Sequence, residues 1–133
     1  MKILLAEDNE LNMEIAEFII QSEGASVVKA WNGQEAVEAF EKSASGEFDV
    51  ILMDVMMPVM NGYEATKAIR RSSHELAKKI PIIAMTANAF VEDRIKSKEA
   101  GMNEHVSKPI DMKLLVKIIA ELAGKNKNRE DKE

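Results

Sequence analysis

The fold is decided by one stretch, Asp49-Val-Ile-Leu-Met-Asp54-Val-Met-Met-Pro58. Its apolar run from Val50 to Met53 has no polar interruption, which is typical of a strand buried on both faces of a parallel sheet. Ligands of such sheets bind beyond the carboxyl ends of the strands, where Asp54 lies. Asp54 is therefore a candidate functional residue, although an Asp in this place can also simply cap the following turn.

Segments typical of strands alternate with segments typical of helices along the chain. Strands are expected at residues 3–6, 26–31, 50–53, 82–85 and 104–107. Helices are expected at residues 10–23, 63–71 and 91–100, after Asn32, and between Asp111 and Gly124. This alternation predicts one α/β domain over residues 1–124, a doubly wound five-stranded parallel sheet with helices on both faces. Residues 125–133 form a charged tail that is expected to be disordered.

Local signals predict how several helices begin, end and pack. Asn9 is expected to cap the first helix, and Gly24 to end it. Asn32 and Glu35 have the spacing of a capping box at the second helix. The first helix is predicted to bury one apolar face, made of Leu11, Ile15, Phe18 and Ile19.

Composition excludes several classes of protein. The net charge is −5 over 133 residues, which argues against a nucleic-acid surface because such a surface needs clustered basic charge. The chain has no cysteine, so disulfides, zinc–thiolate sites and thiol catalysis are excluded. No segment approaches the roughly 18 apolar residues of a membrane span, and no signal peptide is visible. We therefore expect a cytoplasmic protein, or a soluble module of a larger one.

Polar side chains follow four of the predicted strands. Because the carboxyl ends of parallel strands meet on one rim, we expect Glu7, Asp8, Asp54, Thr86 and Lys108 to converge there. Three acids this close repel one another unless a cation joins them, and oxygen ligands of this kind suit Mg²⁺. Lys108 can pair with a phosphate oxygen, and Thr86 can donate a hydrogen bond to another. Asp54 can then act as a nucleophile and form an aspartyl phosphate.

Each of these residues has a plainer interpretation when taken alone. Glu7 or Asp8 could cap the first helix, Thr86 could be an ordinary strand-end residue, and Lys108 could be a solvated surface lysine. Their joint occurrence at four strand ends favours a functional site. His74 has no second ligand at metal spacing and is expected at the surface.

The sequence closely resembles the receiver domain of two-component response regulators over about residues 2–124. The motifs that carry the resemblance are Ile3-Leu-Leu-Ala-Glu7-Asp8-Asn9, Met53-Asp-Val-Met-Met-Pro58 with Asn61-Gly62, Ile83-Ala-Met-Thr86-Ala87, and Gly101-Met102 before Ser107-Lys108-Pro109. The resemblance implies a flavodoxin-like fold with strand order 2-1-3-4-5 and a role in phosphorelay signal transduction. It also implies a domain that catalyses its own phosphorylation and slow dephosphorylation without being a classical enzyme.

The resemblance assigns the phosphoacceptor and the metal ligands. Asp54 is expected to take a phosphoryl group from a phosphohistidine on a histidine kinase or a histidine phosphotransfer domain. Mg²⁺ is expected on the side chains of Glu7, Asp8 and Asp54 and on the backbone carbonyl of Met56.

The resemblance also assigns the groups that pair with the phosphoryl oxygens and switch the domain. Lys108 is the expected phosphate-pairing lysine, with a cis bond to Pro109. The Thr86 hydroxyl and the Ala87 backbone N–H would contact the phosphoryl group. His105 falls where the family usually has an aromatic switch residue, Tyr or Phe. The usual rotation of this side chain from an outward to an inward rotamer is therefore in doubt, or becomes pH-dependent. The output face would comprise the fourth helix, the fifth strand and the last helix, and a homodimer could form through it.

Three other readings remain. A pseudo-receiver would bind partners without being phosphorylated, but such domains usually lose an acid or the lysine. A phosphohydrolase of the haloacid dehalogenase type would carry a second Asp where this chain has Met56. A flavodoxin-like cofactor binder would need a Ser/Thr-rich phosphate loop where Glu7 and Asp8 stand. The sequence leaves open whether this is a free-standing receiver or one excised from a hybrid histidine kinase.

Overall fold

The computed structural model describes residues 1–87, 91–108 and 110–131, and these form five strands and five helices in strict alternation. All strand pairs are parallel, and the sheet order is β2-β1-β3-β4-β5. The strands are β1 (Lys2–Ala6), β2 (Ser26–Ala30), β3 (Val50–Asp54), β4 (Ile82–Thr86) and β5 (Glu104–Ser107). The helices are α1 (Glu10–Ser22), α2 (Gly33–Lys42), α3 (Gly62–Arg71), α4 (Val91–Ala100) and α5 (Met112–Asp131). The predicted fold class and strand order are confirmed.

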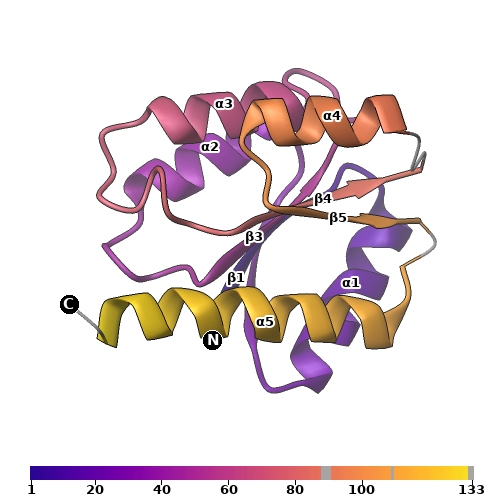
Figure 1. Cartoon of the computed structure of the whole chain (residues 1–133). Coiled ribbons are helices and arrows are strands. Elements are labelled where there is room, and N and C mark those ends of the chain that lie inside the picture. The colour runs from indigo at the N-terminus through magenta and orange to yellow at the C-terminus, as the bar shows by residue number, and fades with distance from the viewer. Residues whose placement is uncertain (88–90, 109, 132–133) are drawn as a thin grey trace.

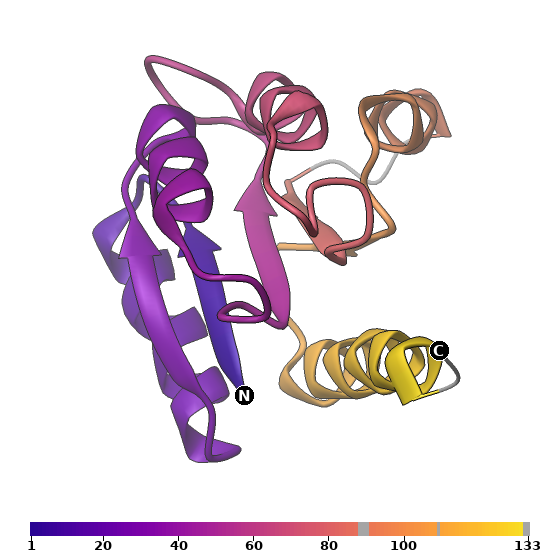
Figure 2. The same cartoon turned by 90° about the vertical axis from the view of Figure 1, so that its left-hand side faces the viewer.

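Helices cover both faces of the sheet (Figures 1 and 2). The helices α1 and α5 lie on one face, and α2, α3 and α4 lie on the other. None of the helices in the described part of the chain is long and apolar enough to cross a bilayer.

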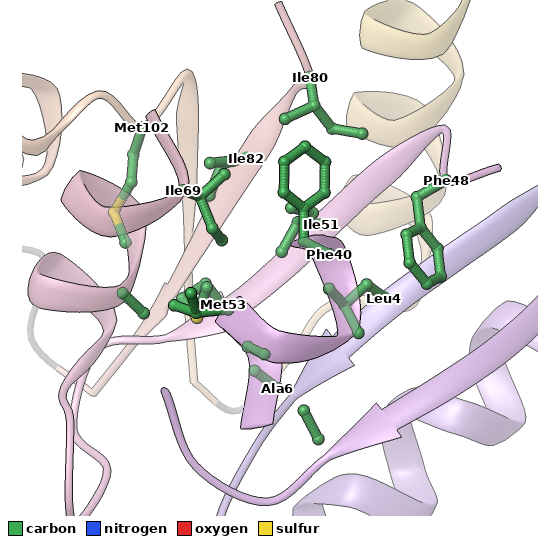
Figure 3. Packing of buried hydrophobic residues seen from close by; sticks show 14 of the residues in the cluster. Leu4, Ala6, Phe40, Phe48, Ile51, Met53, Ile69, Ile80, Ile82 and Met102 are labelled. Carbon is green, nitrogen blue, oxygen red and sulfur yellow. The ribbon is translucent and has the colours of Figure 1, made fainter. Parts of the chain in front are cut away.

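The central strand β3 is buried along its whole length and contributes side chains to both halves of the core. Ile51 and Met53 belong to the cluster in Figure 3, together with Phe40 of α2 and Ile69 of α3. Leu52, between them in sequence, belongs to the other cluster, beneath α1 and α5. Because alternate side chains of a strand point to opposite faces, a strand with helices on both sides must be apolar throughout, as the sequence is here.

Most of the predicted helix ends are confirmed. The Asn9 side chain accepts a hydrogen bond from the Asn12 N–H at 2.9 Å, and Gly24 follows α1 with φ of +84°. At α2 only half of the predicted capping box forms: Asn32 accepts from the Glu35 N–H, whereas the Glu35 carboxylate accepts from the N–H of Trp31.

The predicted buried face of α1 is wrong for three of its four residues. Leu11, Ile15 and Phe18 are 64%, 44% and 67% exposed, and only Ile19 is buried. The buried residues are instead Met13, Ala16, Ile19 and Ile20. At 3.6 residues per turn the two sets lie on opposite sides of the helix, and the side with Met13 is the one that meets β1 and α5.

The last helix is longer than the sequence predicts. We expected it to end at Gly124, but α5 continues to Asp131. A glycine inside a helix costs only about 1 kcal/mol relative to alanine, so it need not end one when good helix formers follow. The predicted domain boundary at residue 124 and the disorder of the tail stay predictions. The expected cis bond before Pro109 lies outside the described residues.

His74 is half-buried rather than simply at the surface, and it joins two loops. Its ring packs on Phe40 with centroids 4.2 Å apart. The Leu76 N–H donates to Nδ1 at 3.0 Å, and Nε2 lies 3.1 Å from the carbonyl oxygen of Ser43. Because Nδ1 accepts a hydrogen bond, the proton of the neutral ring lies on Nε2, which can then donate to Ser43.

Candidate functional site

The carboxyl ends of the strands bring the predicted site residues together. Glu7 follows β1 and Asp54 ends β3, and each places a ligand atom within 4.8 Å of one from Asp8. The Lys108 Nζ, beyond β5, lies 2.9 Å from Glu7 Oε2 and 3.1 Å from Asp54 Oδ2. Thr86 ends β4, and its carbonyl accepts the Lys108 N–H at 2.8 Å. The predicted convergence on one rim is therefore present.

Two of the three acids are buried, which makes their charges costly. Glu7 is 1% and Asp54 3% exposed, whereas Asp8 is exposed. Burial, which has the largest effect, and the neighbouring Glu7 together raise the pKa of Asp54 from 3.8 to about 7, against the opposing effect of Lys108. Burial would lower the pKa of Lys108, but its bonds to Glu7 and Asp54 outweigh burial and raise it. One ammonium thus balances two buried carboxylates, and a net negative charge remains.

The donor set fits a hard divalent cation. Among the described residues, Glu7 Oε2 is the buried side-chain oxygen without a well-aligned hydrogen bond, although Lys108 lies close to it. Asp8 is open to solvent and can hold an ion that keeps several of its waters. Glu7, Asp8 and Asp54 together are the one group of three acids at metal spacing in the part of the chain that the structure describes.

The loop between β3 and α3 fixes the position of Asp54. The Met56 N–H donates to Asp54 Oδ1 at 3.3 Å, and the Gly62 N–H donates to the Val55 carbonyl at 2.9 Å. A Cβ on Gly62 would overlap the backbone carbonyl of Asp54, so the loop can approach the strand this closely only with glycine there.

A strained turn lies within the same loop. Val59 has φ of +71°, and the Met60 N–H bonds the Pro58 carbonyl at 2.7 Å across it. This three-residue turn with a positive φ is rare, and a β-branched residue in it is strained. Val59 is also 81% exposed, so its side chain gains nothing from burial. Strain that the surroundings impose in this way concentrates at functional sites.

The other predicted residues lie at or near the rim, and their roles stay predictions. Thr86 is buried, Ala87 is exposed beside it, and Met56 is 74% exposed. His105 lies on β5, with its Nδ1 3.7 Å from Glu104 Oε1. It lines a groove between α4 and α5 at some distance along the strand from the acids.

The sequence did not reveal an exposed apolar ridge that begins beside the acids. Leu11, Ile15 and Phe18 form this α1 ridge, spaced four and three residues apart on one side of the helix. A hint was available, because the helix is apolar on more than one side, as a helix with two contact surfaces would be.

A sequence profile of the family described as response regulator receiver domain matches residues 3–120.

Curated relatives are long proteins that contain a segment like this chain. Histidine kinase 1 of Arabidopsis thaliana is 38% identical over 152 residues, which cover 92% of this chain and 13% of the relative. Hybrid signal transduction histidine kinase M of Dictyostelium discoideum is 43% identical over 122 residues, which cover 90% of this chain and 5% of the relative. The chain thus spans a small part of the curated relatives it matches.

Solved structures of similar chains match along nearly their whole length. The receiver domain of a Pseudomonas aeruginosa sensor histidine kinase, with a magnesium ion coordinated in the active site cleft, is 39% identical with a TM-score of 0.83. The match covers 92% of this chain and 97% of that one. A co-crystal structure of a Saccharomyces cerevisiae histidine phosphotransfer protein with the receiver domain of its downstream response regulator gives 31% identity and a TM-score of 0.81, covering 92% and 88%.

Proposed function

The chain belongs to the response regulator receiver domain family, and we propose that it is the phosphoacceptor of a cytoplasmic phosphorelay, with Asp54 taking the phosphoryl group. The observation that carries the assignment is the position of Lys108, whose ammonium bridges the two buried carboxylates Glu7 and Asp54. A buried carboxylate with a positive group beside it at a strand end is placed to receive phosphate and to balance its charge.

The proposed step is transfer from nitrogen to oxygen. A carboxylate oxygen of Asp54 attacks the phosphorus of a phosphohistidine, the new P–O bond forms, and the P–N bond breaks. The electron pair of the broken bond returns to the imidazole nitrogen, which takes a proton from water. Lys108 can then leave Asp54 Oδ2, now 3.1 Å away, for an oxygen of the transferred group. The Met56 N–H holds the other oxygen of Asp54.

We infer that Mg²⁺ is the cation that Glu7, Asp8 and Asp54 would hold, with the Met56 carbonyl as a further ligand. The acidic donor set and the buried Glu7 oxygen that lacks a well-aligned hydrogen bond support this, as does the magnesium ion in the Pseudomonas relative. When bound, the ion supplies positive charge against the phosphoryl oxygens.

Intact-mass measurement with acetyl phosphate and Mg²⁺ tests the proposal. We expect the wild-type chain to gain one phosphoryl group and Asp54→Asn to gain none. Asp49→Asn, which removes a carboxylate at the other end of β3, is the matched control and should be labelled like wild type. EDTA should abolish labelling. Labelling of Asp54→Asn would refute the assignment of the acceptor.

An unlabelled wild type would have two explanations that a second measurement separates. Beryllofluoride forms a stable analogue of an aspartyl phosphate. If it binds with Mg²⁺, the phosphoryl group forms and is lost quickly. If it does not bind, the chain is a pseudo-receiver, and the proposed function is wrong.

We propose that the α1 ridge of Leu11, Ile15 and Phe18 docks a histidine phosphotransfer domain. A phosphohistidine must come within bonding distance of Asp54, so the donor protein must cover the rim where α1 begins. The ridge starts four residues after Glu7 and offers apolar surface of the kind that interface cores use. The yeast relative in complex with a phosphotransfer protein supports this choice of partner.

Substitution of the ridge should separate docking from chemistry. Phe18→Ala together with Ile15→Ala should slow phosphotransfer from a panel of phosphohistidine-loaded phosphotransfer domains by about tenfold or more. Labelling by acetyl phosphate should not change, since that donor needs no docking surface. Leu114→Ala on α5 is the matched control, because Leu114 is 46% exposed but lines the groove beside His105 and is not part of the α1 ridge. Equal slowing by the control would contradict the proposed docking site.

The remaining roles follow from the same proposal. Thr86 and the Ala87 N–H would contact the transferred group, and His105 would respond on β5. The face of α4, β5 and α5 would then carry the signal to a partner or to a second copy of the chain. Comparing His105→Tyr with wild type for partner binding at two pH values tests the histidine, and equal binding would remove it from the switch.

A further inference from the structure

Arg70, in the last turn of α3, uses its whole guanidinium to hold two loops at the amino ends of β4 and β5. Its Nε and Nη2 donate to the Gly101 carbonyl at 3.1 and 2.7 Å. Its Nη1 donates to the carbonyls of Ala77 and Ile80 at 3.1 and 2.7 Å, and Nη2 also reaches Asn103 Oδ1 at 2.9 Å. A guanidinium has five N–H donors, and five hydrogen bonds are made.

The groups that accept hydrogen bonds from Arg70 are neutral. Arg70 therefore holds the two loops by directional hydrogen bonds and not by an ion pair. In the described part of the chain, three backbone carbonyls and one side-chain amide receive its bonds, and no carboxylate does. Burial lowers the pKa of Arg70 to about 10, which still leaves it charged at neutral pH. Charge-assisted bonds to a rigid fork fix position more strictly than a single ammonium could.

Arg70 and the four residues that accept its hydrogen bonds, which we call the Arg70 cage, join the end of α4 to the sheet. Gly101 follows α4 directly, with φ of +109°, and a Cβ there would come within 3.0 Å of Arg70 Cγ. Asn103 Oδ1 also accepts the Ile82 N–H at 2.8 Å, and the Asn103 N–H donates to the Ile82 carbonyl at 2.8 Å. The carboxyl end of α4 is thereby joined to α3 and to the first residue of β4.

The described side chains of α4 bury little apolar surface. From residue 93 onward its buried side chains are Ser97 and Ala100, both small and both in its second half. Ile95 is 51% exposed, although it is apolar. The helix lies beside α3 on the outer layer (Figures 1 and 2), and its amino end is the end nearer to Thr86 and the acid rim. One end of α4 is therefore held by Arg70, whereas the side chains of residues 94–96, toward the other end, are exposed.

We propose that Arg70 is the fixed pivot of α4, about which the amino end of the helix turns when the site is phosphorylated. This inference rests on the proposed function, because the force is supplied by the phosphoryl group on Asp54. When the chain is displaced at the carboxyl end of β4, residues 91–96 move with it, while the Arg70 cage keeps residues 98–103 in place. Signalling then changes the tilt of one helix without loosening the sheet beneath it.

Hydrogen exchange measured by mass spectrometry tests the pivot. In wild type, Mg²⁺ with beryllofluoride should change exchange of residues 91–96 at least threefold and leave residues 98–103 within twofold of their starting rates. Arg70→Lys keeps the charge but loses the fork, so exchange of residues 98–103 should rise about tenfold before any phosphoryl analogue is added. Arg71→Lys, the exposed neighbour, is the matched control and should resemble wild type.

Two results would overturn the pivot. One is exchange at residues 98–103 in Arg70→Lys that stays within twofold of wild type. The other is an analogue-induced change in wild type that is as large at residues 98–103 as at residues 91–96. The first comparison needs no phosphorylation, so it remains decisive if the proposed function fails. If Arg70→Lys does not fold, Asn103→Asp supplies the opposite test: the added charge should tighten the cage and slow exchange at residues 98–103, and unchanged or faster exchange would refute the pivot.

Discussion

Replacing Asp54 by asparagine is expected to stabilise the cation-free protein, although it removes the proposed phosphoacceptor. Asparagine has nearly the same shape, and its amide oxygen can still accept the Met56 N–H. It removes a charge that burial and Glu7 disfavour. Lys108 keeps Glu7 as its partner at 2.9 Å, so no buried ammonium is left unpaired.

The raised pKa sets the sign and the pH range of the effect. A carboxyl whose pKa rises from 3.8 to about 7 on folding holds a proton that the unfolded chain releases. Its contribution to stability is therefore present below pH 3.8 and is lost as the pH rises through about 7. Linkage gives an upper limit of about 4 kcal/mol at about pH 8, about 2 at pH 5 and less than about 1 at pH 4. Screening by solvent at the rim reduces this, so Asp54→Asn should gain about 1–4 kcal/mol at pH 8.

Urea unfolding in EDTA at about pH 5, 6.5 and 8 measures this gain directly. The free energy of unfolding of Asp54→Asn should exceed that of wild type by an amount that grows with pH. Mg²⁺ should reverse the order by stabilising wild type more than the variant. Asp49→Asn controls for the loss of a carboxylate just before the start of β3. A variant no more stable than wild type at pH 8, or a gain that is independent of pH, would refute the reasoning about buried charge.

Three further substitutions test the packing around the site by urea unfolding. Gly62→Ala should cost about 2 kcal/mol or more, because the new Cβ would overlap the carbonyl at the end of β3; a neutral result would mean that the loop is looser than described. Val59→Gly should stabilise by up to about 1 kcal/mol by relieving the positive φ of an exposed residue, and a loss of stability would show that no strain is stored there. Met13→Ala should cost about 2–5 kcal/mol and Phe18→Ala less than about 1, since only Met13 is buried; equal costs would contradict the orientation of α1.

The convergence of the site could be predicted because it depends on two robust signals. An uninterrupted apolar strand such as Val50–Asp54 indicates a parallel sheet, and a parallel sheet puts all its strand ends on one side. Glu7, Asp54 and Lys108 could then be placed together with no knowledge of their distances. What the sequence could not give is the balance of charge, since the pKa of Asp54 depends on how deeply it is buried.

The orientation of α1 could not be predicted for a physical reason. A helix with apolar residues on two sides satisfies the pattern rule in two ways, and the choice depends on which side meets the sheet and α5. The sequence pattern alone therefore predicts that the α1 ridge of Leu11, Ile15 and Phe18 faces the core. The cage of Arg70 had no sequence signal either, because its acceptors are mainly backbone carbonyls, which every residue carries.

The polar groups at the two ends of the sheet differ in how well they are satisfied, and we expect this difference to decide which end of α4 responds to phosphorylation. At the carboxyl ends, Asp54 and Glu7 repel each other and Val59 is strained, so this rim is held in an unfavourable state before phosphorylation. At the amino ends, Arg70 has every donor satisfied. A phosphoryl group on Asp54 would add negative charge at this rim, and its oxygens would compete with Glu7 for Lys108. If Arg70 is the pivot, the response to this charge would be concentrated at the rim and the amino end of α4, and the sheet would transmit the signal without being deformed.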